Sequence, residues 1–345
     1  MNTTRHACWL RAFAAVILGV GVLGTAPAVL AQGQVDPAAV AALQRARATV
    51  VGIDVSAVES ARSAESLGAV RRGSGVVIGD DGLVLTIGYL ILEADRVDLV
   101  VERNRRVPAR VVAYDLASGF GLVQALTPLK LAPARFADSS AVSRNEPLLV
   151  ASGGAAGDVS LARVVSQRPF SGYWEYHIDG ALFTAPARTD HSGAALFNAE
   201  GELLGIGSLV VPDALGPGQG RLPGNMFVPV DLLKPILAEL RANGASRSST
   251  RAWLGINSVE SEGGVRVLRV ARDSPGELAG LRPGDRILRI DGTEVSSLES
   301  FYKALWRDTM AERDVALDIR RGATEQTLKV RTEDRMKTFA KPQGI

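Results

Sequence analysis

Short apolar runs at regular intervals are the feature that most restricts the fold of this chain. Between residues 49 and 230 these runs, rich in Val, Ile, Leu and Thr, alternate with turns such as Asp80-Asp81-Gly82. An Asp-Gly turn between two such runs is a strong signal for a β-hairpin. Many short strands without intervening amphipathic helices are typical of a β-barrel or a β-sandwich. The sequence therefore predicts a mostly β fold.

The runs fall into two blocks of similar length, residues 49–142 and residues 145–230. A helix is predicted over residues 231–241, because Leu and Ile recur there at helical intervals, and Gly244 is suited to end it. We expect both blocks and this helix to belong to one domain, residues 49–243.

A separate α+β module is predicted over residues 251–332, after a small polar linker at residues 244–250. Ser296 and Glu299 have the spacing of a capping box, ahead of a helix whose apolar residues recur at helical intervals up to Trp306. The strands that we expect in this module are residues 265–270, 286–290, 315–320 and 327–331.

Residues 1–31 have the parts of a secretory signal peptide. Two arginines precede an apolar core at residues 12–24, and small residues follow it. The core is too short to span a membrane comfortably. Cleavage after Ala31, cleavage after Ala28 and retention as an anchor all stay open. This segment predicts export to a periplasm.

Composition argues against several classes of function. Residues 1–31 hold two arginines and no acidic residue, so the remaining chain has a formal net charge of zero. That charge gives no electrostatic case for binding nucleic acid. Cys8 is the only cysteine and leaves with the signal. No residues have metal-ligand spacing, so we expect no metal, no cofactor and no stable membrane span after signal removal. A helical lead at residues 32–48 and a polar tail at residues 333–345 flank the two domains.

The order of several short motifs resembles the HtrA/DegP family of proteases. The stretches that carry the resemblance are residues 73–86 (GSGVVIGDDGLVLT), 151–166, 227–231 (FVPVD), 253–256 (WLGI), 274–275, 279–281 and 284–285. It covers about residues 49–332. It implies a trypsin-like double β-barrel, then a C-terminal α+β PDZ domain, in a periplasmic protein. Function has to be argued from the site itself.

The stretch Thr189–Leu196 resembles the nucleophile loop of that family, with Ser192 at the serine position. A serine hydrolase of this type also needs an imidazole to take the proton and a carboxylate to orient the imidazole. Tyr89 stands at the histidine position and Gly119 at the aspartate position. A neutral phenol is a poor base, and glycine can orient nothing. Asp190, in the oxyanion region, would place a negative charge where negative charge develops. Ser192 is therefore interpreted as the remnant of a nucleophile.

A substitute base would have to come from a few residues. His191 is adjacent to Ser192, so the two side chains should diverge, and His177 is expected on a partly exposed strand. Lys130 and Lys234 are the lysines of the barrel region, and no motif surrounds either of them. An unconventional pair between the serine and one of these residues stays open as an alternative.

The resemblance places Trp253, Leu254, Gly255 and Ile256 in a loop that captures the C-terminal carboxylate of a peptide. The expected partners are protein or peptide C-termini, and active HtrA-like relatives are further candidates. The first hypothesis is an inactive HtrA-like protein that acts as a chaperone, adaptor or regulator in envelope protein quality control. The alternative is a serine endopeptidase that uses Ser192 with a non-standard base. A purely structural PDZ module that packs on the barrels also stays open.

Overall fold

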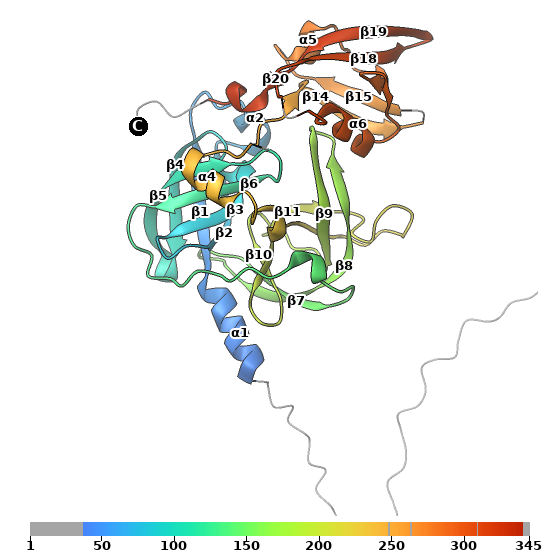
Figure 1. The fold of residues 1–345 in the computed structure, drawn as a ribbon. Helices are drawn as coiled ribbons and strands as arrows, with labels where there is room; N and C mark the ends of the chain where they lie inside the picture. The colour runs from blue at the N-terminus through green and yellow to red at the C-terminus, as the bar shows by residue number, and fades with distance from the viewer. Residues whose placement is uncertain (1–36, 248, 263, 309, 341–345) are drawn as a thin grey trace, which may run out of the picture. The chain divides into compact units, whose positions relative to one another are not determined.

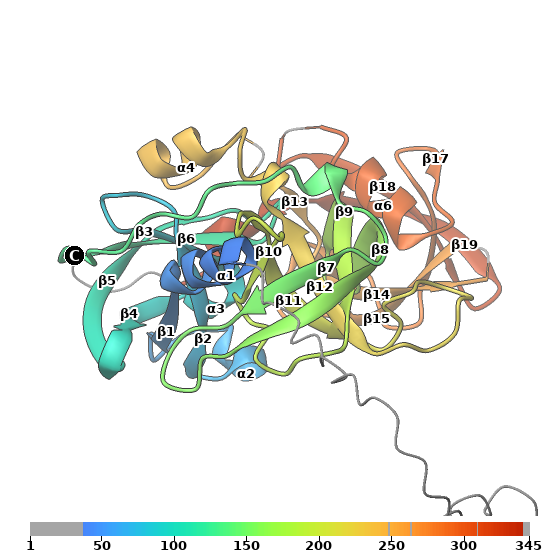
Figure 2. The same ribbon diagram turned by 90° about the horizontal axis from the view of Figure 1, so that it is seen from below.

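The computed structural model describes residues 37–247, 249–262, 264–308 and 310–340, and it is mostly β, as predicted (Figure 1). The expected signal peptide lies outside the described residues. α1 (Pro37–Ala48) begins with a proline, which suits the first turn of a helix. Its Ala42 and Ala46 are buried, and the helix contacts residues 147–151; Figure 2 shows it in front of the barrels, seen from below.

The first barrel closes through six antiparallel strands in the order β1-β2-β3-β6-β5-β4. They are β1 (Val50–Ala57), β2 (Val70–Val77), β3 (Leu83–Ile87), β4 (Ala94–Val101), β5 (Arg105–Tyr114) and β6 (Phe120–Ala125). The connections contain α2 (Ala64–Leu67), α3 (Gly88–Ile91) and η1 (Glu102–Asn104). Leu85, Phe120 and Leu122 are completely buried in its core. α3 starts directly where β3 ends, and Tyr89 is its second residue.

The second barrel closes in the order β10-β11-β12-β9-β8-β7. Its strands are β7 (Pro147–Ala151), β8 (Val159–Gly172), β9 (Tyr176–Ala185), β10 (Ala195–Phe197), β11 (Leu203–Val211) and β12 (Gly224–Pro229), preceded by η2 (Ser139–Ala141). Phe183, Phe197 and Phe227 are completely buried in its core. β8 has 14 residues, and its hairpin with β9 reaches out of the barrel toward the C-terminal module (Figure 1).

The closing segment corrects one prediction. The helix expected over residues 231–241 is split into η3 (Val230–Leu232) and α4 (Leu237–Asn243). The physical reason is Pro235, since a proline disfavours the helical conformation of the residue before it. Gly244 ends α4 in the left-handed conformation, as predicted.

The C-terminal module contains an antiparallel sheet in the order β14-β15-β16-β18-β19, and β17 pairs with β16. Its elements are β13 (Ala252–Trp253), β14 (Ile256–Ser261), β15 (Gly264–Val270), α5 (Pro275–Leu278), β16 (Arg286–Ile290), β17 (Thr293–Glu294), α6 (Leu298–Leu305), β18 (Asp314–Arg321), β19 (Thr324–Arg331), β20 (Glu333–Asp334) and η4 (Arg335–Thr338). β13 pairs with β20 beside this sheet, and β14 is an edge strand of it.

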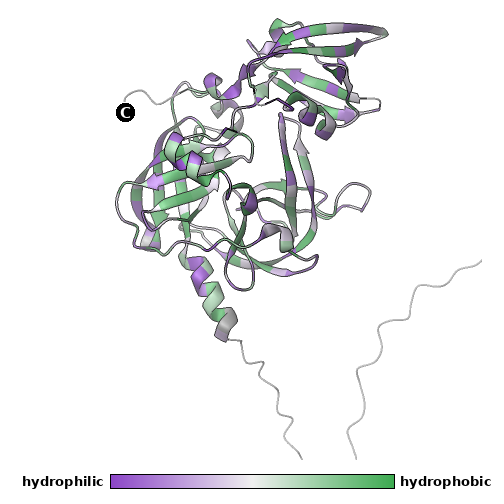
Figure 3. Cartoon of the chain, viewed as in Figure 1, coloured by the Kyte–Doolittle hydropathy of each residue, from purple (hydrophilic) through white to green (hydrophobic). Residues whose placement is uncertain are grey.

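The capping residues of α6 differ from the predicted pair. Ser297 is the N-cap: its Oγ accepts from the Ser300 N–H, and Ser300 Oγ accepts from the Ser297 N–H, so the expected capping box of Ser296 and Glu299 was wrong by one residue. The helix turns Leu298, Phe301 and the following apolar residues into the core of its module, while apolar and polar residues alternate along many of the strands (Figure 3). Among the described residues, no helix is both long enough and apolar enough to span a bilayer.

Candidate active site and carboxylate-binding loop

Hydrogen bonds to both barrels fix the backbone around Ser192. The Ser74 N–H on β2 donates to the Ser192 carbonyl at 2.9 Å, and the Gly193 N–H donates to Gly207 on β11 at 2.9 Å. Gly193 has a φ of +73°, and a Cβ there would lie 2.0 Å from the Ser74 carbonyl oxygen. Only glycine fits this close approach. The serine is therefore held rigidly between the barrels.

The phenol of Tyr89 is the hydrogen-bond partner of the Ser192 side chain. Its Oη lies 2.7 Å from Ser192 Oγ and 2.9 Å from the carbonyl oxygen of Ser208. A phenol has one proton and can donate it to only one of these acceptors at a time. Burial raises the pKa of Tyr89 to about 12, although the hydrogen bond with Ser192 acts in the opposite direction. The neighbour of the serine hydroxyl is therefore a neutral phenol.

Gly119 lies in a turn that leaves little room for a larger residue. Its φ is +81°, and a Cβ there would lie 3.0 Å from Tyr176 Oη. The Tyr176 hydroxyl donates to the Ser118 carbonyl at 2.6 Å. Asp115, earlier in the same turn, is buried and accepts hydrogen bonds from Ser118 and from Ser249. The space where an orienting carboxylate would extend is thus filled by Tyr176.

The carboxylate of Asp190 points at partners other than Ser192. Arg188 Nε donates to its Oδ1 at 2.9 Å, and the Ser152 hydroxyl donates to its Oδ2 at 2.5 Å. Burial acts to raise the pKa of Asp190, but these hydrogen bonds outweigh it and hold the pKa below its usual range. The φ of Asp190 is not positive. The charge expected from the sequence is present, and an arginine neutralises it.

The imidazoles of the described residues make no hydrogen bond with Ser192. His177 Nδ1 lies 2.8 Å from Ser171 Oγ, and His191 Nδ1 lies 3.1 Å from the Thr189 carbonyl. The prediction of a partly exposed His177 was wrong: only 5% of its surface is exposed, because α6 covers this part of the hairpin.

The two lysines are also engaged elsewhere or exposed. Lys234 Nζ donates to the Ala137 carbonyl at 2.6 Å and pairs with Asp231. Lys130 is exposed to solvent. None of the four candidate bases from the sequence is brought to Ser192 by a hydrogen bond.

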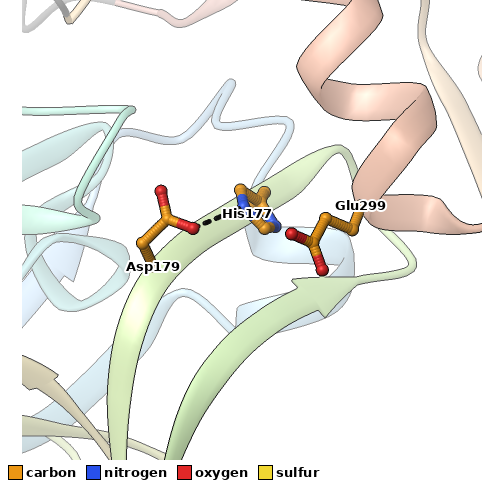
Figure 4. A group of neighbouring side chains, drawn as sticks. All are labelled: His177, Asp179 and Glu299. Atoms are coloured by element: carbon orange, nitrogen blue, oxygen red, sulfur yellow. Dashed lines mark ion pairs between the residues drawn. The ribbon is translucent and has the colours of Figure 1, made fainter.

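One cluster combines the ligand types that a divalent cation uses, namely His177, Asp179 and Glu299 (Figure 4). Their ligand atoms lie within 4.8 Å of one another, on β9 and α6. The ammonium of Lys303 already lies 2.6 Å from Glu299 Oε1 and 3.5 Å from Asp179 Oδ1. A cation could bind here only after this ammonium moved away, so the cluster is described as an ion-pair network.

The loop that begins the C-terminal module surrounds a carboxylate from the second barrel. The backbone N–H of Leu254 donates to Glu175 Oε1 at 2.8 Å, and those of Gly255 and Ile256 donate to Oε2 at 2.9 and 3.0 Å. Three of the four residues predicted for carboxylate capture thus supply donors, while Trp253 pairs with β20.

Glu175 is a site residue that the sequence analysis missed. It lies between β8 and β9, with a φ of +59°. Burial raises its pKa to about 7, against the three backbone hydrogen bonds and the charge of Arg335, which lower it. An acidic residue inside the aromatic run Tyr173–Tyr176 is the only sequence signal that could have pointed to it.

Comparisons with known proteins agree with this arrangement. The trypsin-like peptidase domain family matches residues 73–206, and the PDZ domain family matches residues 252–332. Together these matches support an HtrA/DegP-like family. Among curated relatives, the HtrA/DegP-like chain is 28% identical over 238 residues to the periplasmic serine endoprotease DegP of Escherichia coli (strain K12), covering 65% of this chain and 49% of that one. It is 28% identical over 241 residues to a probable serine protease do-like of Buchnera aphidicola, covering 66% and 49%.

Solved structures resemble the fold of the HtrA/DegP-like chain. The HtrA-type protease AlgW with decapeptide superposes with a TM-score of 0.55 at 19% identity, covering 86% of this chain and 98% of that one. A serine endoprotease from Yersinia pestis has a TM-score of 0.55 at 20% identity, covering 87% and 99%. The HtrA/DegP-like chain spans about half the length of the curated relatives it matches.

Proposed function

We propose that this HtrA/DegP-like protein has lost peptidase activity and acts in the periplasm by binding protein C-termini through its PDZ domain. The observation that carries the first half is the 2.7 Å contact between Ser192 Oγ and the phenol of Tyr89. With a pKa of about 12, roughly one Tyr89 in 10⁵ is ionised at neutral pH. An imidazole at the same place would accept the serine proton readily, because its pKa lies near 6.5.

The other groups that assist this chemistry are replaced as well. Gly119 offers no carboxylate, and Tyr176 fills the adjacent space. Asp190 stands at the position where the resemblance expects the oxyanion glycine, and its carboxylate is bonded to Arg188 and Ser152. A Ser–His–Asp enzyme depends on these groups acting together, so their joint replacement supports a loss of hydrolysis rather than a modest decrease.

The three N–H donors that converge on Glu175 support the second half of the proposal. They form a preorganised receptor for one carboxylate, and the terminal carboxylate of a peptide has the same acceptor geometry. From this module the protein would act as a chaperone, adaptor or regulator in envelope quality control. The partners that we propose are unfolded or damaged proteins and active HtrA-like relatives.

The test for lost activity uses a fluorophosphonate probe and unfolded casein with the purified protein. We expect no labelling and no cleavage, and the Ser192→Ala variant should behave like the natural protein in both assays. Cleavage that disappears in Ser192→Ala would establish the serine endopeptidase alternative.

The test for binding uses fluorescent heptapeptides with randomised sequence and a free C-terminal carboxylate, together with amidated copies. We expect the free-carboxylate pool to bind and amidation to abolish binding. Equal binding of both pools would contradict carboxylate capture. Ser192→Ala should bind as the natural protein does, because the two sites share no residue.

A further inference from the structure

The tip of the β8–β9 hairpin (residues 172–176) contacts the PDZ groove with its backbone as well as with Glu175. The Ser258 N–H of β14 donates to the Tyr173 carbonyl at 2.9 Å. Tyr302 of α6 donates its hydroxyl to the Gly172 carbonyl at 2.7 Å and accepts the Glu175 N–H at 3.1 Å. The tip therefore lies between β14 and α6, at the edge of the PDZ sheet.

These contacts have the two components of peptide recognition by strand addition. A ligand of this kind bonds its backbone to an exposed sheet edge and places its terminal carboxylate in a nest of N–H groups. Here the edge strand β14 donates a hydrogen bond to the Tyr173 carbonyl. The nest of three N–H groups, from Leu254, Gly255 and Ile256, binds the side-chain carboxylate of Glu175. A second carboxylate cannot enter, because Glu175 already uses these donors and only 8% of its surface is exposed.

Aromatic stacking and a hydrogen bond to the first barrel hold the hairpin tip in place. Trp174 stacks on Tyr176 with ring centroids 5.8 Å apart, and the Tyr176 hydroxyl is bonded to the Ser118 carbonyl of the first barrel. On the PDZ side, Tyr302 stacks on Trp306 with centroids 4.9 Å apart. Aromatic stacking thus fixes both the hairpin and α6, and the Glu175 carboxylate extends from a rigid segment.

We propose that the tip of the β8–β9 hairpin is an internal ligand that closes the PDZ groove, and that a protein C-terminus binds only by displacing it. The inference rests on the proposed function, since it names how that same groove is controlled. The ligands that open the groove are peptides with a free terminal carboxylate, whose oxygens can accept from the same three donors. Because the tip is covalently tethered, its effective concentration at the groove is high, and free peptides displace it only when their own concentration is high.

The test compares Glu175→Ala and Glu175→Gln with the natural protein in the heptapeptide assay. Alanine removes all three hydrogen bonds to the nest, and the free-carboxylate pool should then bind about a hundredfold more tightly. Glutamine puts an NH₂ donor where one carboxylate oxygen accepted, so its gain should be intermediate. Glu294→Ala is the matched control, because Glu294 is an exposed acidic residue of the same module, and it should bind like the natural protein.

The possible failures can be told apart. If all variants bind the free-carboxylate pool with the same affinity, the internal ligand is refuted while the proposed function stands. If no variant distinguishes the free from the amidated pool, the proposed function fails.

Hydrogen exchange of the Leu254, Gly255 and Ile256 amides gives a second measurement without any peptide. These amides should be protected in the natural protein and exchange faster in Glu175→Gln, and fast exchange in the natural protein would overturn the proposal.

Discussion

Peptide affinity should rise as the pH increases from 6 to 8, because Glu175 has a higher pKa in the closed groove than in water. Burial raises that pKa to about 7, whereas an exposed glutamate has a pKa near 4.3. The closed state therefore holds its proton more tightly than the open state does. Its extra stability is fully present below the pKa of the open state and is lost as the pH rises through about 7.

The magnitude follows from the two pKa values. Between pH 6 and pH 8, the open state gains about tenfold over the closed state, or about 1.4 kcal/mol. Arg251 and Arg335 line the same small cavity as the carboxylate, and burial raises the pKa of Tyr302 well above its usual range, so its phenol stays neutral between pH 6 and pH 8.

The assay is the anisotropy of the free-carboxylate heptapeptide pool at pH 6, 7 and 8. The natural protein should bind about ten times more tightly at pH 8 than at pH 6, and Glu175→Gln should show no such trend. The glutamine variant keeps His177, whose pKa burial lowers, and therefore isolates any contribution of that imidazole. Affinity that is constant or falls with pH in the natural protein, or an equal slope in Glu175→Gln, would refute this reasoning.

Three further predictions concern residues around the two sites. Tyr89→His alone should leave the protein unreactive toward a fluorophosphonate probe, because Gly119 offers no carboxylate to orient the new imidazole; strong labelling would show that the glycine is not limiting. Gly119→Asp should lower the free energy of unfolding in urea by about 1–3 kcal/mol more than Gly218→Asp does, since both glycines have a positive φ but only the first meets Tyr176; equal losses would contradict the packing argument. Tyr302→Phe removes two hydrogen bonds to the hairpin tip and should tighten binding of the heptapeptide pool roughly tenfold, and unchanged affinity would show that these bonds do not hold the groove closed.

Much of the fold could be predicted from the sequence because the signals are local. The apolar runs and their turns indicate strands wherever a barrel can bury them, and the motifs that resemble a protease family place Tyr89 and Gly119 near Ser192. The contact of Tyr89 Oη with Ser192 Oγ joins residues 103 positions apart, and only the resemblance made it foreseeable. Local reasoning failed at Pro235, where one residue splits a helix whose apolar spacing is otherwise regular.

The role of Glu175 could not be predicted in this way. Its partners in the carboxylate-binding loop are 79 to 81 residues away in sequence. The motif of the loop predicts a carboxylate ligand, but nothing in the sequence of the hairpin or of the loop links that ligand to Glu175. The same holds for the burial of His177, which depends on α6 packing against β9. Both features depend on the packing of the β8–β9 hairpin against the PDZ domain, and the residue pattern of neither segment predicts that packing.

The tether of the hairpin tip also affects the concentration of C-termini that is needed to open the groove. Because the carboxylate of Glu175 is part of the same chain as its receptor, it cannot be diluted away, and effective concentrations of tethered groups are commonly in the millimolar range. A scarce C-terminus therefore leaves the groove shut, whereas an abundant pool of protein fragments fills it. On the proposal above, the protein would respond to the quantity of free chain ends around it, with a threshold set by the contacts of the hairpin tip.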